Sequence, residues 1–228
     1  MKDLIALLPM KANSERIKNK NLKSLCGQPL FFYIADTLRK INTIKKLVIN
    51  TDSEEISNIA KERYSNWVQI HIRPINLRGD EVSMNKIINY DVNKLGLNNI
   101  YLQTHSTNPL LREETLNSAI KKFSKYFLNN ENSSLFSANL LKSRLYDDKL
   151  LPINHDPSNL MRTQDLKSIF EENSCFYIFY GATFVKNYHR ISKNPYVFPM
   201  ARNSVESIDI DDKEDWLLAQ QIISSLTN

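Results

Sequence analysis

Glycine is scarce in this chain of 228 residues, which contains only four. Neither GxGxxG nor GxxxxGK followed by Ser or Thr occurs anywhere in it. These glycine-rich loops bind dinucleotides or nucleoside triphosphates because glycine lets the backbone approach a phosphate closely. The sequence therefore argues against a dinucleotide-binding domain and a P-loop, and a phosphate site would have to use other residues.

Cysteine and long apolar runs are also scarce. The two cysteines, Cys26 and Cys175, are isolated, with no CxxC motif and no nearby histidine, so neither a zinc site nor a disulfide framework is indicated. No apolar run approaches the ~18 residues that a membrane-spanning helix needs, and the apolar start of the chain is followed at once by Lys11. These absences predict a protein of the reducing cytoplasm without a membrane partner.

Neither sign of charge dominates. Thirty Lys and Arg residues face 25 Asp and Glu residues, for a net charge of +5, and both signs are spread along the chain. Proteins that bind nucleic acids usually gather basic residues in one tract or on one face, so no nucleic-acid partner is expected. The four histidines show no metal-ligand spacing. With 42% hydrophobic residues the chain can bury one core, and we expect a single domain over residues 1–228.

Short apolar runs alternate with longer segments of helical period. Strands are expected at residues 4–8, 46–51, 68–72, 99–104, 134–139 and 176–185. Helices are expected at residues 29–41, 53–64, 83–96, 112–127 and 213–226, with Ser53 and Ser83 as N-caps. This alternation predicts a three-layer α/β/α fold with a mostly parallel sheet. Such sheets bind their ligands at the carboxyl ends of the strands.

The turn after the first expected strand falls at that edge and is basic. Pro9 and Asn13 interrupt helix formation and leave backbone amides free, while Lys11, Arg16 and Lys20 bring positive charge. Free amides together with positive charge predict a phosphate-binding loop. A solvated basic loop without a ligand is an equal alternative on charge alone.

The acidic segment DIDD is the candidate metal site. If Ile208 and Ile210 point into the core from an extended segment, Asp209 and Asp211 lie together on its other face. Two carboxylates suit magnesium (or manganese), because such cations prefer hard oxygen ligands. Asp212 alternates away and is expected to cap the helix that follows. The alternative is an acidic turn that only caps this helix.

Five blocks stand in chain order: LLPMKANSERIKNKNLKSLCGQPL, NTDSEEI, RPINLRGDEVSMN, YLQTHSTNPLL and SIDIDDKEDW. Together they resemble the acylneuraminate cytidylyltransferases, or CMP-sialic acid synthetases, and the related enzymes that activate other 2-keto-3-deoxy sugar acids. The resemblance covers nearly the whole chain. It implies a Rossmann-like nucleotidyltransferase that transfers CMP from CTP to the anomeric hydroxyl of a sialic acid-like sugar and releases pyrophosphate.

The resemblance also implies roles for individual residues. Lys20, Asp209 and Asp211 would be catalytic, and the two aspartates would hold the metal ion. Gln103 would contact the sugar acid. The nucleotide-binding residues that it implies are Lys11, Ser14, Arg16, Lys20, Asn21, Arg73 and Ser83.

Two positions depart from the family's pattern. Lys11 stands where the family often has arginine, and it keeps the charge but lacks the two-pronged guanidinium. Glu15 stands where many members have lysine, so Arg16 is expected to take over part of the phosphate binding. Asp52, in the block NTDSEEI, is expected to cap the following helix rather than to act in catalysis.

Residues 143–173 break the alternation of strands and helices. The segment is long for a connection and too apolar for a disordered linker. The family uses a comparable excursion to contact a second subunit, so the resemblance implies a homodimer in which Lys142, Arg144 and Arg162 are candidates to face the sugar carboxylate. Two other functions stay open: the same fold with another nucleotide or acceptor, and a non-catalytic nucleotide-binding module. An RNA-binding module would need clustered arginines and exposed stacking aromatics, which the sequence lacks.

Overall fold

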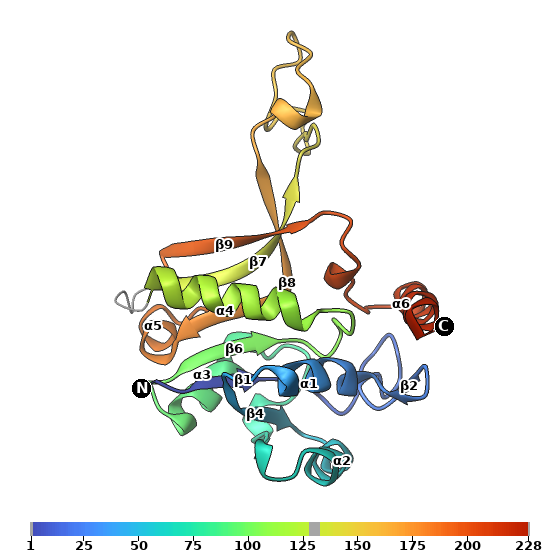
Figure 1. Cartoon of the computed structure of the whole chain (residues 1–228), viewed down its shortest axis with the longest axis vertical. Helices are drawn as coiled ribbons and strands as arrows, with labels where there is room; N and C mark the ends of the chain where they lie inside the picture. Colours follow the sequence, from blue (N-terminus) through green and yellow to red (C-terminus); the bar gives the residue numbers. More distant parts are fainter. Residues whose placement is uncertain (1, 128–132, 228) are drawn as a thin grey trace.

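The computed structural model describes residues 2–127 and 133–227. Its centre is a seven-stranded sheet with the order β5-β4-β1-β6-β8-β7-β9 (Figure 1). The strands are β1 (Leu4–Leu7), β4 (Ile44–Thr51), β5 (Val68–Ile72), β6 (Ile100–Thr104), β7 (Ser133–Leu141), β8 (Ile169–Tyr180) and β9 (Asn194–Ala201), while β2 (Ser24–Leu25) and β3 (Gln28–Pro29) pair separately. β8 runs antiparallel to β6 and β7, and the other pairs of the large sheet are parallel. The predicted mostly parallel sheet is confirmed.

Helices cover both faces of this sheet. The α-helices are α1 (Leu30–Lys40), α2 (Glu54–Tyr64), α3 (Met84–Leu95), α4 (Glu113–Phe127), α5 (Gly181–Asn187) and α6 (Lys213–Thr227). Short 3-10 turns span Ser65–Trp67, Ile75–Leu77, Thr163–Asp165 and Val205–Ser207. Because side chains alternate along a strand, Ala6 of β1 packs with α1, α2 and α4, whereas its neighbour Leu7 packs with α3 and α5. The three predicted layers are therefore confirmed.

A third, smaller core cluster attaches α6 to the amino-terminal part of the chain. Trp216 and Ile223 of α6 pack with Ile17 and Leu25, and Ile210 is fully buried in the same cluster. This packing holds the segment before α6 against the loop that follows β1. No helix in the described part of the chain is long and apolar enough to cross a lipid bilayer.

Two of the differences from the sequence prediction have a clear physical cause. The strand expected at residues 176–185 is wrong in its second half, because β8 ends at Tyr180 and Gly181 starts α5. A Cβ atom at Gly181 would lie 2.9 Å from the Leu97 carbonyl oxygen, so only glycine permits this close approach of the chain to the end of α3. β9 was not expected, since Pro195 and Pro199 argue against a strand. The structure places it at the edge of the sheet, where proline is tolerated.

Residues 142–168 form an arm that projects away from the sheet (Figure 1). The paired ends of β7 and β8, from Ala138–Glu172 to Leu141–Ile169, form its base. The arm accounts for most of the excursion expected at residues 143–173.

The two predicted helix caps have different outcomes. Ser53 caps α2 as predicted, because its hydroxyl accepts the amide of Ile56 at 3.2 Å. Ser83 stands at the N-cap of α3, but its side chain accepts no capping hydrogen bond.

Candidate active site

The loop after β1 continues the line of that strand along the carboxyl edge of the sheet. Its amides at Leu8 and Met10 donate to the carbonyls of Val48 and Asn50 at 2.9 Å, so hydrogen bonds to β4 fix the start of the loop. Two residues after Met10, the Ala12 amide donates to Oδ1 of Asp52 at 2.7 Å. The prediction that Asp52 caps α2 is therefore wrong: Ser53 caps the helix, and Asp52 holds the loop instead.

Arg73 connects the same loop to β4 through hydrogen bonds. It is buried, and its guanidinium donates to the Asn50 side chain at 2.8 Å and to the Met10 carbonyl at 3.0 Å. Burial lowers the pKa of Arg73, and the charges of Asp52 and Asp91 oppose that shift. Arg73 is therefore not a surface arginine, and its hydrogen bonds hold the loop in place.

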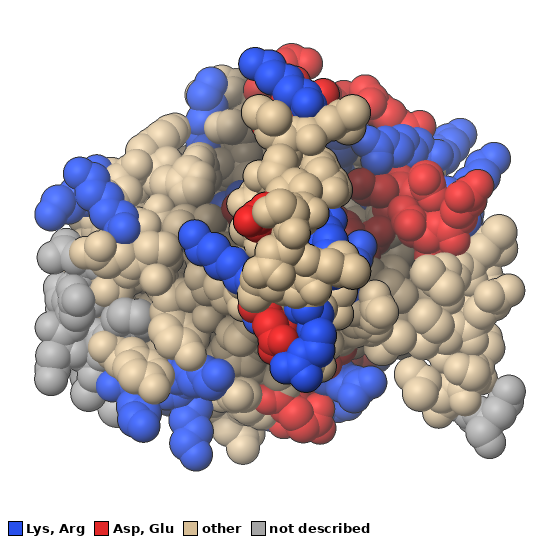
Figure 2. Space-filling view, turned by 90° about the horizontal axis from the view of Figure 1, so that it is seen from above, with Lys and Arg blue, Asp and Glu red and all other residues tan. Residues whose placement is uncertain are grey.

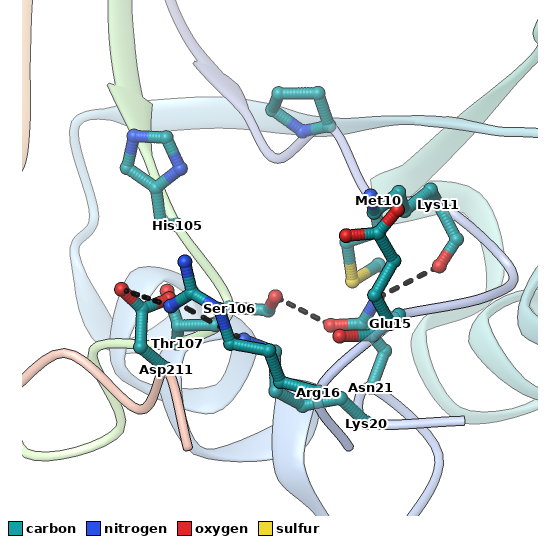
Figure 3. Close-up of a pocket in the computed structure, with 12 residues that line it drawn as sticks. Met10, Lys11, Glu15, Arg16, Lys20, Asn21, His105, Ser106, Thr107 and Asp211 are labelled. Carbon is teal, nitrogen blue, oxygen red and sulfur yellow. Dashed lines mark hydrogen bonds and ion pairs between the residues drawn. The ribbon is translucent and has the colours of Figure 1, made fainter. Parts of the chain in front are cut away.

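A cavity of about 280 Å³ opens between this loop, the segment after β6 and the segment before α6 (Figure 3). Lys11, Ser14, Arg16, Lys20 and Asn21 all line it, which brings together the five residues that the sequence predicted in this loop. Its other lining residues are Pro9, Met10, Glu15, His105, Ser106, Thr107 and Asp211.

Two of the cationic side chains converge on one carboxylate. In Figure 3, Arg16 and Lys20 reach across the cavity toward Asp211, with an Arg16 nitrogen 3.1 Å and the Lys20 Nζ 3.8 Å from its oxygens. Lys20 also donates to the Ile210 carbonyl at 2.6 Å. Burial lowers the pKa of Lys20, and the charges of Asp211 and Asp209 oppose this shift. The cavity thus presents a largely shielded lysine and an exposed arginine to an anion.

Two further contacts order the rest of the loop. Asn21 is buried, donates to the Lys11 carbonyl at 2.9 Å and accepts the Ser106 hydroxyl at 2.6 Å. The Lys11 ammonium forms an ion pair with Asp80, which follows the 3-10 turn after β5. Asn21 therefore acts as a bridge between the two walls, and Lys11 is paired with an acid at the cavity mouth.

Asp209 lies beside Asp211 in the segment that precedes α6. One of its carboxylate oxygens, Oδ1, is shielded from water and has no hydrogen-bond partner among the described residues. Burial and the charge of Asp211 raise the pKa of Asp209, while Thr107 and Lys20 oppose the shift. Ile210 points into the core as predicted. Asp212 caps α6 as predicted, since its Oδ1 accepts the amides of Glu214 and Asp215 at 2.8 and 3.1 Å.

A shielded oxygen without a donor suits a cation, because a buried carboxylate is costly unless something pairs with it. The described residues contain no group of three or more His, Cys, Asp or Glu that would hold a metal by themselves. A cation held here would therefore complete its shell with ligand oxygens and water, which is the usual arrangement for magnesium at a phosphate site.

Four of the predicted site residues do not line the cavity: Arg73, Ser83, Gln103 and Asp209. Ser83 is exposed at the start of α3, and Gln103 is fully buried behind His105. His105 and Thr107 also line the cavity, although the sequence did not predict them as site residues. Their position just after a strand, at the carboxyl edge of the sheet, could have indicated them. A single histidine has no characteristic spacing that marks it as functional.

The chain matches the family model described as "Cytidylyltransferase" over residues 5–222. It is 26% identical to a pseudaminic acid cytidylyltransferase of Campylobacter jejuni over 225 residues, covering 94% of each chain. It is 23% identical to the CMP-N,N'-diacetyllegionaminic acid synthase of Legionella pneumophila, covering 96% of each. Another relative, from Helicobacter pylori, is named as both a pseudaminic acid cytidylyltransferase and a hydrolase; it is 26% identical over 90% of this chain, which spans only 40% of that protein.

Solved structures agree on the fold. A CMP:2-keto-3-deoxy-manno-octonic acid synthetase complexed with CTP superposes with a TM-score of 0.69 at 10% identity, covering 98% of this chain and 99% of the other. A 4-diphosphocytidyl-2C-methyl-D-erythritol synthase from Anaerococcus prevotii gives a TM-score of 0.68 at 14% identity, covering 98% and 96%. The family match spans nearly all of the chain and confirms the resemblance seen in the five sequence blocks. This chain belongs to the cytidylyltransferase family.

Proposed function

We propose that this protein transfers CMP from CTP to the anomeric hydroxyl of a 2-keto-3-deoxy sugar acid and releases pyrophosphate. The observation that carries the proposal is the cavity that Lys11, Arg16 and Lys20 of the loop after β1 line together, with Arg16 and Lys20 paired to Asp211. Phosphoryl-group transfer depends mainly on positioning and on neutralising negative charge, and this cavity offers both. The relatives named for pseudaminic and legionaminic acids support a sugar acid as the acceptor.

Asp209 and Asp211 are the residues that we propose to hold magnesium. The shielded, unpartnered oxygen of Asp209 and the carboxylate of Asp211 at the cavity wall support this assignment. A bound divalent cation would offset the negative charge of the phosphate that is transferred.

The protein's own residues bind and orient the nucleotide. Arg16 and Lys20 are paired with Asp211 in the free protein, and a triphosphate offers them more negative charge in the same place. Arg73 acts by fixing the loop through the Met10 carbonyl. As the sugar oxygen forms its bond to the α-phosphorus, the bond from that phosphorus to the oxygen bridging the α- and β-phosphates breaks. The sugar hydroxyl loses its proton to solvent, and pyrophosphate leaves with the electron pair of the broken bond.

The arm supports a homodimer, which we propose as the working assembly. Figure 2 looks down on the arm and shows mostly uncharged surface along it, with charged patches to its sides. Leu150, Ile153 and Leu160 are exposed there, and large apolar side chains that gather on one projection usually mark a protein contact. Within the arm, Lys142 donates to the Leu166 carbonyl at 2.8 Å and Arg162 to Asp165 at 2.7 Å, so neither is free to reach a ligand without giving up a contact.

The proposal is tested by incubating the protein with CTP, magnesium and one of four acids: N-acetylneuraminate, legionaminate, pseudaminate or an octulosonate. Mass spectrometry should detect a CMP-linked product with at least one acid, together with equimolar pyrophosphate. CTP binding without product from any of the four would move the proposal to another acceptor. The absence of both binding and product would contradict it.

A further inference from the structure

Arg190 lies behind the wall of the cavity, in the connection between α5 and β9. Its Nη1 donates to the Gln103 Oε1 at 2.8 Å, and its guanidinium carbon lies 4.0 Å from the centre of the Tyr177 ring. Its Nε is buried without a hydrogen-bond partner, and no carboxylate of the described residues lies within 4.0 Å of its nitrogens. A buried cation without a paired acid is costly, so its position calls for a function.

The first effect of Arg190 is to orient the amide of Gln103. An arginine can only donate hydrogen bonds, so the oxygen of the amide must face Arg190 and the nitrogen must face the other way. That nitrogen donates to the Thr104 carbonyl at 2.9 Å and lies 3.1 Å from the Nε2 of His105. All the amide protons of Gln103 are thereby used.

The second effect falls on His105, which lines the cavity. Because the Gln103 nitrogen donates toward it, the His105 Nε2 must accept, and the single proton of the neutral ring is on Nδ1. Nδ1 has no hydrogen-bond partner among the described residues. Burial, assisted by the nearby Arg190 cation, lowers the pKa of His105 to about 4, so the ring is neutral near pH 7.

We propose that Arg190 is a positioning residue that acts through Gln103 so that His105 presents its Nδ1–H donor to an anionic oxygen of the bound substrates. Arg190 donates to Gln103, and Gln103 donates to His105. The last residue of this chain of hydrogen bonds therefore has its Nδ1–H left as a donor at the cavity. Lys11, Arg16 and Lys20 stand on the other wall, where a phosphate can replace the acids that pair with them in the free protein. The oxygen at His105 therefore comes from the acceptor carboxylate or from a phosphate that the lysines and arginine leave unpaired. The inference rests on the proposed function only for the identity of that oxygen.

The direct test is 15N NMR of the histidine rings in the full chain, free and with CTP. The wild type should show His105 as the Nδ1–H tautomer. Gln103→Glu keeps the shape and gains an ion pair with Arg190, so it should fold, but its carboxylate accepts where the amide donated. His105 should then carry its proton on Nε2, or on both nitrogens. An Nε2–H tautomer in the wild type, or the same spectrum in both proteins, would overturn the proposal.

Kinetics and calorimetry identify the oxygen. If it belongs to the acceptor, Arg190→Met should raise the KM for the sugar acid about tenfold and leave the KM for CTP within twofold, as for the loss of one hydrogen bond to a charged group. If it belongs to a phosphate, the effect should fall on the Kd of CTP, which calorimetry measures without any acceptor. The control Arg39→Met removes an exposed arginine of α1 and should change neither constant. If Arg190→Met changes neither the KM for the sugar acid nor the Kd of CTP, the proposal is contradicted even when turnover is confirmed. The NMR test does not depend on turnover, so it separates this proposal from the proposed function.

Discussion

At the scale of single residues, the cations of the cavity are all paired with acids in the free protein. The pair between Lys11 and Asp80 involves two exposed side chains at the mouth. Asp80 competes with a triphosphate for Lys11, so Asp80→Asn should tighten CTP binding. Exposed ion pairs contribute up to about 1 kcal/mol, so the Kd should fall by as much as about fivefold. Isothermal titration calorimetry without an acceptor measures this.

Glu114→Gln is the matched control, because it removes one negative charge from an exposed position on α4. It should leave the Kd of CTP within about 1.5-fold. Weaker binding by Asp80→Asn would show that Asp80 assists the nucleotide and does not compete with it.

His105 makes a prediction about stability and pH. Its pKa is about 4 in the folded protein, against 6.5 for an unperturbed ring. Between these values the unfolded chain binds a proton that the folded chain does not, so the contribution is complete above pH 6.5 and is lost as the pH falls toward 4. The free energy of unfolding should fall by about 3 kcal/mol more for the wild type than for His105→Asn between pH 7 and pH 4. Urea unfolding at a series of pH values measures this, and an equal fall in the free energy of unfolding for the two proteins would rule it out.

Sequence reasoning reached the basic side of the site but not its other wall. Lys11, Arg16 and Lys20 were predictable because charge and helix breakers gather within a dozen residues after a strand. Arg190 lies 87 residues from Gln103, and nothing in the local sequence links them. Asp52 was assigned to the wrong partner for a related reason: its position before a helix fits a cap, and only the fold brings the Ala12 amide to it.

At the scale of elements, the loop after β1 depends on its attachment to β4 and β5. Arg73 supplies charged hydrogen bonds to the Met10 carbonyl and to Asn50. Arg73→Met removes the donor from the Met10 carbonyl and from the Asn50 side-chain oxygen, while the Asn50 carbonyl keeps the Met10 amide as a donor. A hydrogen bond to a charged group contributes about 1.5–3 kcal/mol, and the losses of neighbouring bonds are not additive. The free energy of unfolding should therefore fall by about 2–4 kcal/mol, and the KM for CTP should rise. Arg39→Met, on the outer face of α1, should cost less than about 1 kcal/mol in the same denaturation experiment.

The elements with strong periodicity could be predicted, and those whose identity depends on position in the sheet could not. β5 was placed at its observed residues 68–72, and β1, β4, β6 and β7 were found within two residues at each end. The short apolar run after Tyr180 reads equally as strand or helix, and the contact of Gly181 with Leu97 decides for α5. β9 was hidden by its two prolines, whose place at the sheet edge only the fold reveals.

At the scale of the whole molecule, the arm predicts the assembly. Leu150 and Leu160 expose 79% and 84% of their surface, so replacing them costs the monomer little stability. If the arm contacts a second copy, Leu160→Glu should weaken the dimer at least tenfold, because it places a charge in an apolar contact. Sedimentation velocity over a dilution series measures this.

Leu226→Glu, at an exposed position of α6, serves as the control and should leave the dimer intact. A wild type that sediments as a fully active monomer at every concentration would contradict the dimer.

We expect the carboxylates before α6 and the basic loop after β1 to act together on CTP. The most direct measurement is pyrophosphate release with CTP, magnesium and the acid that the wild type accepts, compared among Asp209→Asn, Lys20→Ala and Asp212→Asn. Asp212 only caps α6, and asparagine also caps helices, so this variant controls for the loss of one nearby charge. We expect kcat/KM to fall about a hundredfold or more in the first two variants and by less than about twofold in the third. If Asp209→Asn and Lys20→Ala keep the same kcat/KM as Asp212→Asn, the two groups of residues do not act together on CTP.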